Sequence, residues 1–386
     1  MKIAVCQRFC PEYIVPLFER LAARWDIRFF FSLYGKQHDF FFNPAVVARI
    51  PCTALTPPAF PLLPFQSRAL NKLSVSAHVT SLSGQLVRAL WHGDYDVMIG
   101  GDFGRFECVT AWAAARARRR AFVLWSDAWH WPVSRRDRLR RPLVRRMVKD
   151  AGAFLAGGSR AGAKLVELGA SPGRIFNVFH TNVCAQPKPS APASDGFVLY
   201  VGRLDERKGV EYLLRAFARI QPHAPAVRLK IAGVGPLQPH LERLSWELGV
   251  ADAVDFLGWV DHAAVDTLYR DCALFVLPSI FSRDGGYEPF SNVVLEAMAW
   301  GRPVISTTAN GASFDVIVSG VNGLVVPDRD VDALAGAVRE ILDDPERAAA
   351  MGLRAWETIR DDFNVDRMAE RFSDALACVE AARARV

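Results

Sequence analysis

A proline-rich stretch, residues 186–195, divides the sequence into two runs in which strand-like and helix-like segments alternate. Its three prolines stand among small and polar residues, a composition that suits neither a helix nor a central strand. Alternation of short apolar and longer amphipathic segments predicts a parallel sheet covered by helices. We therefore expect an α/β protein with one domain over residues 1–185 and a second over residues 196–364. Residues 40–66, dense in Phe and Pro, are expected to form an irregular loop.

The composition is that of a globular protein. With 386 residues and 51% apolar content, the chain has enough material for two hydrophobic cores. No run of 18 apolar residues indicates a transmembrane helix, and the N-terminus reads as a first strand rather than as a signal peptide. The seven cysteines are odd in number and scattered, which favours reduced thiols. We expect a cytoplasmic protein.

Positive charge is concentrated in the first half. Residues 1–185 carry 26 Lys/Arg and 12 Asp/Glu, a net charge of +14, whereas the remainder carries 21 and 29, a net charge of −8. The densest basic stretch, residues 135–149, includes apolar side chains at helical spacing and suits a peripheral contact with anionic lipid headgroups. The alternative is a basic face that contacts only solvent. Nucleic-acid binding is disfavoured because no element that could recognise bases accompanies the charge. Pro142 is expected to interrupt this helix or to begin it.

Two glutamates, Glu288 and Glu296, frame a stretch that predicts a loop and a helix, followed by a buried strand. Ser291 is expected to be the N-cap of the helix, which leaves the amides of Asn292 and Val293 available to an anion such as phosphate. Glu296 lies about five residues further on, roughly 7–8 Å from that anion, where the ribose of a nucleotide would lie. Glu288 stands on the other side of the phosphates, where a transferred group would lie. The alternative is that one glutamate complements the helix dipole and the other faces water.

Two further stretches of the second half could contact a nucleotide. Arg203 and Lys208 stand five residues apart in the loop after an apolar strand, and two cations at the carboxyl edge of a parallel sheet suit a diphosphate. The segment Gly258-Trp259-Val260 ends another strand; its glycine permits close approach, and the backbone of Val260 could read a base edge. A solvated loop and a strand end with a packed Trp are the respective alternatives.

Taken together, these motifs resemble the retaining glycosyltransferases of family 4. The hallmarks of that family are two glutamates separated by seven residues, an Ala-Met-Ala-like helix, Gly-x-Pro-Val-Ile and a later Asn-Gly-Leu-Val-Val-Pro. In this sequence they are Glu288/Glu296, Ala297–Ala299, Gly301–Ile305 and Asn322–Pro327. The resemblance covers nearly all of residues 196–364. It implies the GT-B architecture: two Rossmann-like parallel-sheet domains facing a central cleft, the first for the acceptor, the second for a nucleotide sugar. It also implies a final helix, residues 365–386, that joins the first domain.

The resemblance assigns roles to the motif residues. The diphosphate would be held by Arg203 and Lys208 with the segment Ser291, Asn292 and Val293, so that no metal or other cofactor is needed. Glu296 would hold the ribose of a UDP- or GDP-type donor, and the base would lie at Gly258, Trp259 and Val260. The transferred sugar would contact Glu288, Pro289 and Phe290. The leaving diphosphate itself would assist the acceptor on the same face, so that catalysis consists mainly of charge stabilisation, positioning and exclusion of water.

The sequence departs from the family pattern at three places. Glu288-Pro-Phe-Ser stands where Glu-Gly-Phe-Gly is common, which makes the sugar loop stiffer. The usual Gly-Gly loop after the first strand is replaced, with Arg8 as a candidate substitute in phosphate binding. Many relatives place a His in the cleft where this sequence has Asp127, a candidate to orient or deprotonate an acceptor hydroxyl. His130 is the rival, and a turn cap at Asp127 is the alternative.

These observations predict a retaining glycosyltransferase that transfers a sugar to a glycan or lipid-linked acceptor at the cytoplasmic membrane face. One rival is a soluble transferase that acts on a small metabolite. The other is a nucleotide-sugar-binding protein without transfer activity. A dehydrogenase is disfavoured because no strand is followed by Gly-x-Gly-x-x-Gly.

Overall fold

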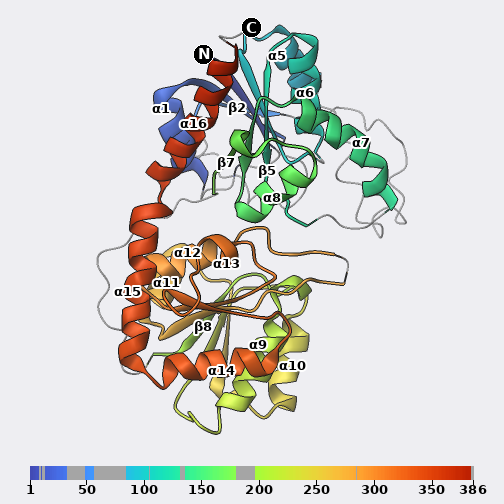
Figure 1. Cartoon of the computed structure of the whole chain (residues 1–386). Helices are drawn as coiled ribbons and strands as arrows, with labels where there is room; N and C mark the ends of the chain where they lie inside the picture. The colour runs from blue at the N-terminus through green and yellow to red at the C-terminus, as the bar shows by residue number, and fades with distance from the viewer. Residues whose placement is uncertain are drawn as a thin grey trace. The chain divides into compact units, whose positions relative to one another are not determined.

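The computed structural model describes residues 1–7, 10, 14–32, 48–55, 84–103, 105–130, 135–179, 196–283 and 285–383, and for residues 135–139 and 383 only the backbone. The chain forms two compact units (Figure 1). The first comprises Met1–Asn182 together with Val365–Val386, and the second comprises Val183–Asn364. Each is described by itself below.

The first unit is a seven-stranded parallel sheet in the order β3-β2-β1-β4-β5-β6-β7. Its strands are β1 (Lys2–Gln7), β2 (Asp26–Ser32), β3 (Cys52–Leu55), β4 (Val97–Gly101), β5 (Ala121–Ser126), β6 (Ala153–Ala156) and β7 (Ile175–Asn177). Its helices are α1 (Val15–Arg24), α5 (Gly84–His92), α6 (Phe106–Ala117), α7 (Arg135–Asp150), α8 (Ser159–Glu167), the 3-10 turn η2 (Pro172–Arg174) and α16 (Val365–Arg383). The strand order reverses direction between β1 and β4, as in doubly wound sheets.

The last helix of the chain is part of the first unit. Helix α16 packs against α1, β6 and β7 (Figure 1). Phe372 of α16 meets the buried ring of Trp125 at 5.7 Å between ring centroids. An ion pair between Arg20 Nε and Asp366 Oδ1, at 2.7 Å, adds a polar contact at the start of the helix. The apolar side of α16 thus completes the core of a unit whose other elements all end at or before Asn177, far earlier in the sequence.

The second unit is a six-stranded parallel sheet in the order β10-β9-β8-β11-β12-β13. Its strands are β8 (Val198–Val201), β9 (Leu229–Ala232), β10 (Val254–Gly258), β11 (Leu274–Leu277), β12 (Val304–Thr307) and β13 (Gly323–Val326). Its helical elements are η3 (Glu206–Lys208), α9 (Val210–Ile220), α10 (Gln238–Glu247), η4 (Ala251–Ala253), α11 (His262–Asp271), α12 (Asn292–Ala299), α13 (Ala312–Asp315), α14 (Val331–Leu342) and α15 (Pro345–Asp362). Here the order reverses between β8 and β11, so the loops after these two strands diverge and leave room for a ligand at the carboxyl edge.

The α/β class and the parallel sheets predicted from the sequence are confirmed, and two local predictions are wrong. Residues 52–55, expected in an irregular loop, form the edge strand β3, which pairs with β2 from Phe29 to Ser32. Helix α7 continues through Pro142 instead of breaking there. Pro142 is exposed. Its missing backbone hydrogen bond and the clash of its ring with the preceding turn cost about 3 kcal/mol, which the rest of the 16-residue helix outweighs. The proline-rich linker lies outside the described residues.

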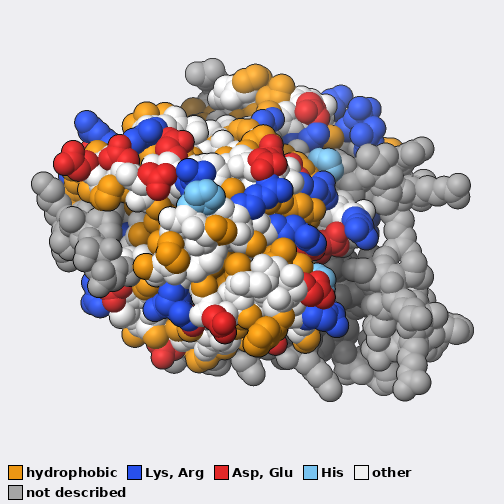
Figure 2. Space-filling view, turned by 90° about the horizontal axis from the view of Figure 1, so that it is seen from below, with side chains coloured by type: hydrophobic (Ala, Val, Ile, Leu, Met, Phe, Trp, Pro, Cys, Tyr) orange, Lys and Arg blue, Asp and Glu red, His pale blue; other side chains and the backbone are white. Residues whose placement is uncertain are grey.

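The surface carries both signs of charge. Figure 2 shows one face on which acidic and basic side chains are interspersed among apolar ones. Ion pairs such as Arg215–Glu211 on α9, at 2.8 Å, join neighbours of opposite sign. Among the described residues, no helix is long and apolar enough to cross a membrane.

Candidate active site

The loop after β8 is fastened to the end of β11. Gly209 closes the 3-10 turn η3 with φ of +65°, and a Cβ added there would lie 2.0 Å from the carbonyl oxygen of Pro278. The backbone amide of Ile280 donates to the carbonyl of Arg207 at 2.9 Å. Only glycine fits both the positive φ and the close approach. This packing fixes Lys208, the residue before Gly209, at the point where the strand order reverses.

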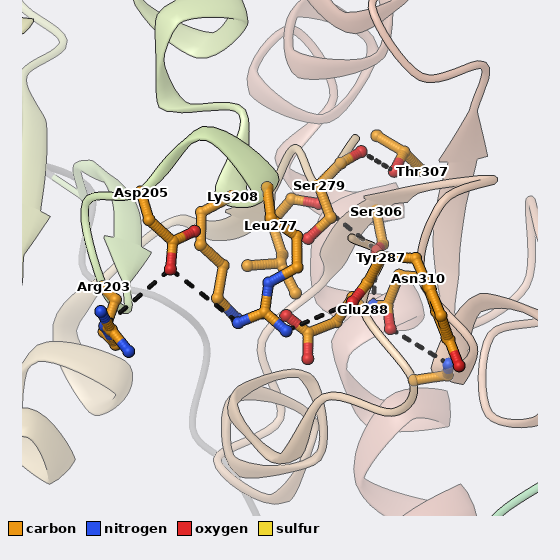
Figure 3. A network of polar contacts seen from close by, with 12 residues as sticks. Arg203, Asp205, Lys208, Leu277, Ser279, Tyr287, Glu288, Ser306, Thr307 and Asn310 are labelled. Atoms are coloured by element: carbon orange, nitrogen blue, oxygen red, sulfur yellow. Dashed lines mark hydrogen bonds and ion pairs between the residues drawn. The ribbon is translucent and has the colours of Figure 1, made fainter. Parts of the chain in front are cut away.

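Lys208 meets Glu288 in a buried ion pair (Figure 3). The Nζ of Lys208 donates to Oε2 of Glu288, and the two side chains are only 11% and 8% exposed. Two residues that the sequence assigns to diphosphate and to sugar, 80 positions apart, are therefore direct neighbours. A charge pair so sheltered from water interacts more strongly than a surface pair.

The backbone of Glu288 is held on both sides. Its amide donates to the carbonyl of Ala309 at 3.3 Å, and its carbonyl accepts from the amide of Gly311 at 2.9 Å. The guanidinium of Arg207 donates to the neighbouring carbonyl of Tyr287 at 3.2 Å. The loop that carries Glu288 is thus attached both to the segment after β12 and to the turn that carries Lys208.

A buried polar layer lies under this loop, and the sequence reading missed it (Figure 3). The amide of Asn310 donates to the hydroxyl of Ser306 at 2.9 Å, and its oxygen accepts from the backbone of Ala312 at 3.1 Å. The hydroxyl of Thr307 donates to the carbonyl of Ser279. Ser306 and Thr307 end the buried strand β12 and Asn310 follows it, and that position at the carboxyl edge was the signal available in the sequence. Their bonds tie the ends of β11 and β12 together beneath Glu288.

Arg203, the other predicted diphosphate ligand, is exposed at the same edge. Its side chain is 60% exposed, and its Nε lies 3.9 Å from Oδ2 of Asp205. The hydroxyl of the buried Tyr200 donates to its carbonyl at 2.7 Å. The backbone of Arg203 is therefore fixed while the guanidinium extends into solvent, which suits a cation that reaches a ligand.

Helix α12 begins where the sequence placed it, because Ser291 is the N-cap and Asn292 is the first helical residue. The side chain of Ser291 is buried but makes no capping hydrogen bond. Ser291 therefore occupies the expected N-cap position without forming the expected bond. Asn292 and Val293 are half-buried at the first turn, as are Pro289 and Phe290 just before it. An anion at this helix end would meet the backbone N–H groups of the first turn.

Glu296 projects from α12 toward α11. Its Oε2 accepts a hydrogen bond from the hydroxyl of Tyr269 at 3.0 Å. Burial raises the pKa of the Glu296 carboxyl, while the Tyr269 hydroxyl and the nearby His262 act in the opposite direction. Burial, together with the charge of Glu296, also raises the pKa of Tyr269 well above its usual range, which keeps that hydroxyl a donor. The sequence analysis did not identify Tyr269, because no motif around this residue indicates that its hydroxyl would bond to Glu296.

The segment predicted to contact a base lies at the edge strand β10. Gly258 has φ of +66° with open space around its α-carbon, and its carbonyl accepts from the amide of Gly233 at 2.7 Å. Trp259 is 69% exposed, so the alternative of a packed tryptophan is wrong. Val260 follows, half-buried, before α11. An exposed ring beside an open glycine provides a surface on which a planar group could stack.

The candidate residues of the first unit follow β5. Asp127 lies directly after the strand, and a Cβ added at Gly157 would come within 2.1 Å of its Oδ1. His130 is half-buried, with its ring 6.4 Å from that of Trp129. Arg8 lies outside the described residues. No cluster of three or more His, Cys, Asp or Glu that could hold a metal ion occurs in the part of the chain that the structure describes.

Two doubly wound parallel sheets, with the last helix returned to the first unit, define the GT-B fold. The chain matches the crystal structure of Anabaena HepE in complex with UDP at a TM-score of 0.74, over 98% of this chain and 100% of that chain. The two sequences are 18% identical, so this likeness shows the fold alone.

The family follows from the sequence comparison. Residues 185–357 match the model of the family described as glycosyl transferases group 1, the family that the glutamate motif indicates. It is 40% identical over 147 residues to an uncharacterized glycosyltransferase of Methanocaldococcus jannaschii, covering 38% of this chain and 36% of that protein. It is 32% identical over 195 residues to the lipopolysaccharide core biosynthesis glycosyltransferase LpsE of Rhizobium meliloti, covering 49% and 52%. The matched segment thus spans between about a third and a half of these relatives' length.

Proposed function

We propose that the protein transfers a sugar from a nucleotide diphosphate sugar to a glycan or lipid-linked acceptor, with retention of configuration and without a metal. The observation that carries this proposal is the buried contact between Lys208 and Glu288 at the reversal point of the second sheet. It places a cation suited to a diphosphate against a carboxylate suited to sugar hydroxyls. One ligand that contains both groups, a nucleotide sugar, would engage both residues at once.

The donor would lie along the carboxyl edge of the second unit. Arg203 and Lys208 would neutralise the diphosphate with the amides of residues 291–293, which is the task that a metal performs in other transferases. Glu296, held by Tyr269, would accept hydrogen bonds from the ribose hydroxyls. Residues 258–260 would receive the base, and residues 288–290 the sugar.

In the transfer step, the bond between the sugar's anomeric carbon and the diphosphate breaks, and a bond to the acceptor oxygen forms on the same face. The acceptor's proton passes to the leaving diphosphate oxygen, whose developing charge Lys208 and Arg203 stabilise. Glu288 fixes the sugar hydroxyls, so its contribution is positioning and charge stabilisation around the anomeric carbon. Asp127, with His130 as the rival, would orient the acceptor hydroxyl from the first unit.

The acceptor is proposed to be a growing glycan or a lipid-linked sugar at the cytoplasmic face of a membrane. The net charge of +14 on residues 1–185 supports an anionic partner for this half of the chain. The similarity to a lipopolysaccharide core biosynthesis glycosyltransferase points in the same direction. Polysaccharide or glycolipid biosynthesis is the corresponding biological setting.

A thermal-shift panel of nucleoside diphosphates and nucleotide sugars tests the donor half of the proposal, because a ligand of the folded state raises its apparent stability. We expect UDP or GDP and one of their sugars to raise the Tm with no divalent cation and with EDTA present. Release of the nucleoside diphosphate in the presence of an acceptor then distinguishes a transferase from a binding protein. No shift with any nucleotide would refute the donor site.

A further inference from the structure

A cavity of about 450 Å³ lies in the first unit, between the end of α7, the start of β6 and the segment that joins α8 to β7. Its floor is apolar, with Val148 and Phe154 among the residues that line it. Its rim carries three cations: Arg145 and Lys149 from α7, and Arg174 from the turn η2. A site with an apolar floor and a cationic rim matches a ligand that has an anionic head and an apolar neighbour.

The cations on the rim differ from the basic residues beside them. Within the described part of the chain, Arg145, Lys149 and Arg174 have no acidic partner, whereas Arg146 pairs with Asp150 at 3.2 Å. The acidic side chains nearest in sequence are already engaged. Asp150 is also bound by Arg116 and Trp112, each at 3.0 Å, and Glu167 pairs with Lys164. The rim therefore keeps an uncompensated positive charge.

Two of these cations belong to a row along α7. Arg141, Arg145 and Lys149 are spaced by four residues, so they lie on one side of the helix, and all are exposed. Val144 and Met147 are buried on another side of the helix, so the side that carries the row of cations faces outward. Like charges at this spacing destabilise a helix, and an anion that bridges them relieves the repulsion.

We propose that this cavity binds the phosphate of an anionic phospholipid headgroup. Arg145 and Arg174 grip the phosphate oxygens from opposite sides, and Lys149 adds a third charge. The row on α7 lies against the surrounding headgroups. The inference deepens the membrane contact proposed above and rests on it, by naming the residues and the chemical group that make the contact.

The cavity is separate from the candidate acceptor site. It lies at the amino-terminal ends of β6 and β7, since Ala151 and Arg174 precede these strands, whereas Asp127 follows the carboxyl end of β5. Helix α7 runs back from the Asp127 edge to the cavity, and its 16 residues measure roughly 24 Å. A membrane along α7 would therefore extend from the headgroup cavity toward the edge at which a lipid-linked acceptor is expected.

The test is co-sedimentation of the full chain with vesicles of phosphatidylcholine alone or with added phosphatidylglycerol. The cavity variant R145Q/R174Q is compared with R146Q/K164Q, which removes two cations that have acidic partners. Both lower the net charge by two, so long-range attraction falls equally. We expect the cavity variant to lose about 30-fold in partitioning onto phosphatidylglycerol vesicles, and the control roughly threefold or less. Circular dichroism and the nucleotide thermal shift check that both variants fold.

Each outcome decides something. Equal losses in the two variants would show only diffuse electrostatic attraction and overturn the cavity. A wild-type chain that does not bind phosphatidylglycerol vesicles overturns the membrane contact and the assignment of a lipid to the cavity. If free glycerol 3-phosphate at millimolar concentration raises the Tm of the wild type through the cavity while vesicles do not bind, the ligand is a soluble phosphate and the lipid assignment is wrong. None of these results bears on donor binding, which the nucleotide panel tests separately.

Discussion

Lys208 and Glu288 form a buried ion pair across the point where the strand order of the second unit reverses. The first comes from the turn before α9 and the second from the loop before α12. Each is the other's direct neighbour, so a bound nucleotide sugar would compete with or share this contact. The pair therefore serves both the stability of the loops and the proposed chemistry, and the two contributions can be separated by mutation.

Lys208→Met should lower both stability and nucleotide affinity. It leaves the Glu288 carboxylate buried without its cation, which costs about 3–5 kcal/mol of unfolding free energy. It also removes the charge-assisted bond that we propose Lys208 makes to the diphosphate, so we expect nucleoside diphosphate binding to weaken roughly 10- to 100-fold. Urea unfolding and calorimetric titration measure the two effects.

The double variant Lys208→Met with Glu288→Gln is the matched control. With both charges removed, most of the lost stability should return, whereas nucleotide affinity should stay low. Recovery of both properties would show that Lys208 acts only through Glu288 and has no diphosphate role.

Glu288→Gln alone should reduce turnover far more than nucleotide binding. Glutamine retains the shape of the side chain but removes the charge near the anomeric carbon, and one such electrostatic contact is worth about 100- to 1,000-fold in kcat. Affinity for the free nucleoside diphosphate, measured by titration, should change little because it lacks the sugar. An equal fall in turnover and in nucleotide affinity contradicts the separate roles assigned to the two glutamates.

Tyr269→Phe should make nucleotide binding depend more strongly on pH. Burial raises the pKa of Glu296, and the Tyr269 hydroxyl counteracts this by donating to the carboxylate at 3.0 Å. Loss of the hydroxyl raises the pKa of Glu296 further, so the ionised form, which we propose accepts from ribose, is lost at a higher pH than in the wild type. We expect the variant to bind more weakly at low pH and to approach wild-type affinity as the pH rises.

A 2′,3′-dideoxynucleoside diphosphate provides the control, because it cannot donate to Glu296. The wild type should prefer the ribonucleotide over it, and Tyr269→Phe should lose that preference at low pH. A uniform loss for both nucleotides at every pH would indicate that Tyr269 only supports the packing of α11.

The sequence contains local signals for much of the second unit, but few for contacts across it. Gly301, with φ of +69°, marks the end of α12 because a left-handed position favours glycine, and Ser291 is of a residue type common at the first position. Tyr269 and Glu296 are separated by 27 residues, and Lys208 and Glu288 by 80. Such pairs form only when parallel strands bring distant loops to one edge. The register of the sheet determines which residues meet in such pairs, and the local sequence pattern contains no information about that register.

The two local errors have a similar origin. The strand β3 is four residues long, too short for a periodic pattern, and its pairing with β2 supplies what the segment lacks by itself. Helix α7 continues through Pro142 because its flanking turns favour the helix by more than the proline costs. Tertiary and neighbouring interactions outweighed single-residue preferences in both cases.

Gly209→Ala should destabilise the second unit and weaken nucleotide binding. The backbone at Gly209 has φ of +65°, and an added Cβ would lie 2.0 Å from the carbonyl oxygen of Pro278. The strained backbone alone costs about 1–3 kcal/mol, and the overlap forces the turn that carries Lys208 away from β11. Gly336→Ala is the matched control, because Gly336 is exposed within α14 and has open space around it. That change should stabilise the protein by about 0.5–1 kcal/mol and leave nucleotide affinity unchanged. If Gly209→Ala unfolds at the same urea concentration as the wild type, the close approach to Pro278 does not hold the site together.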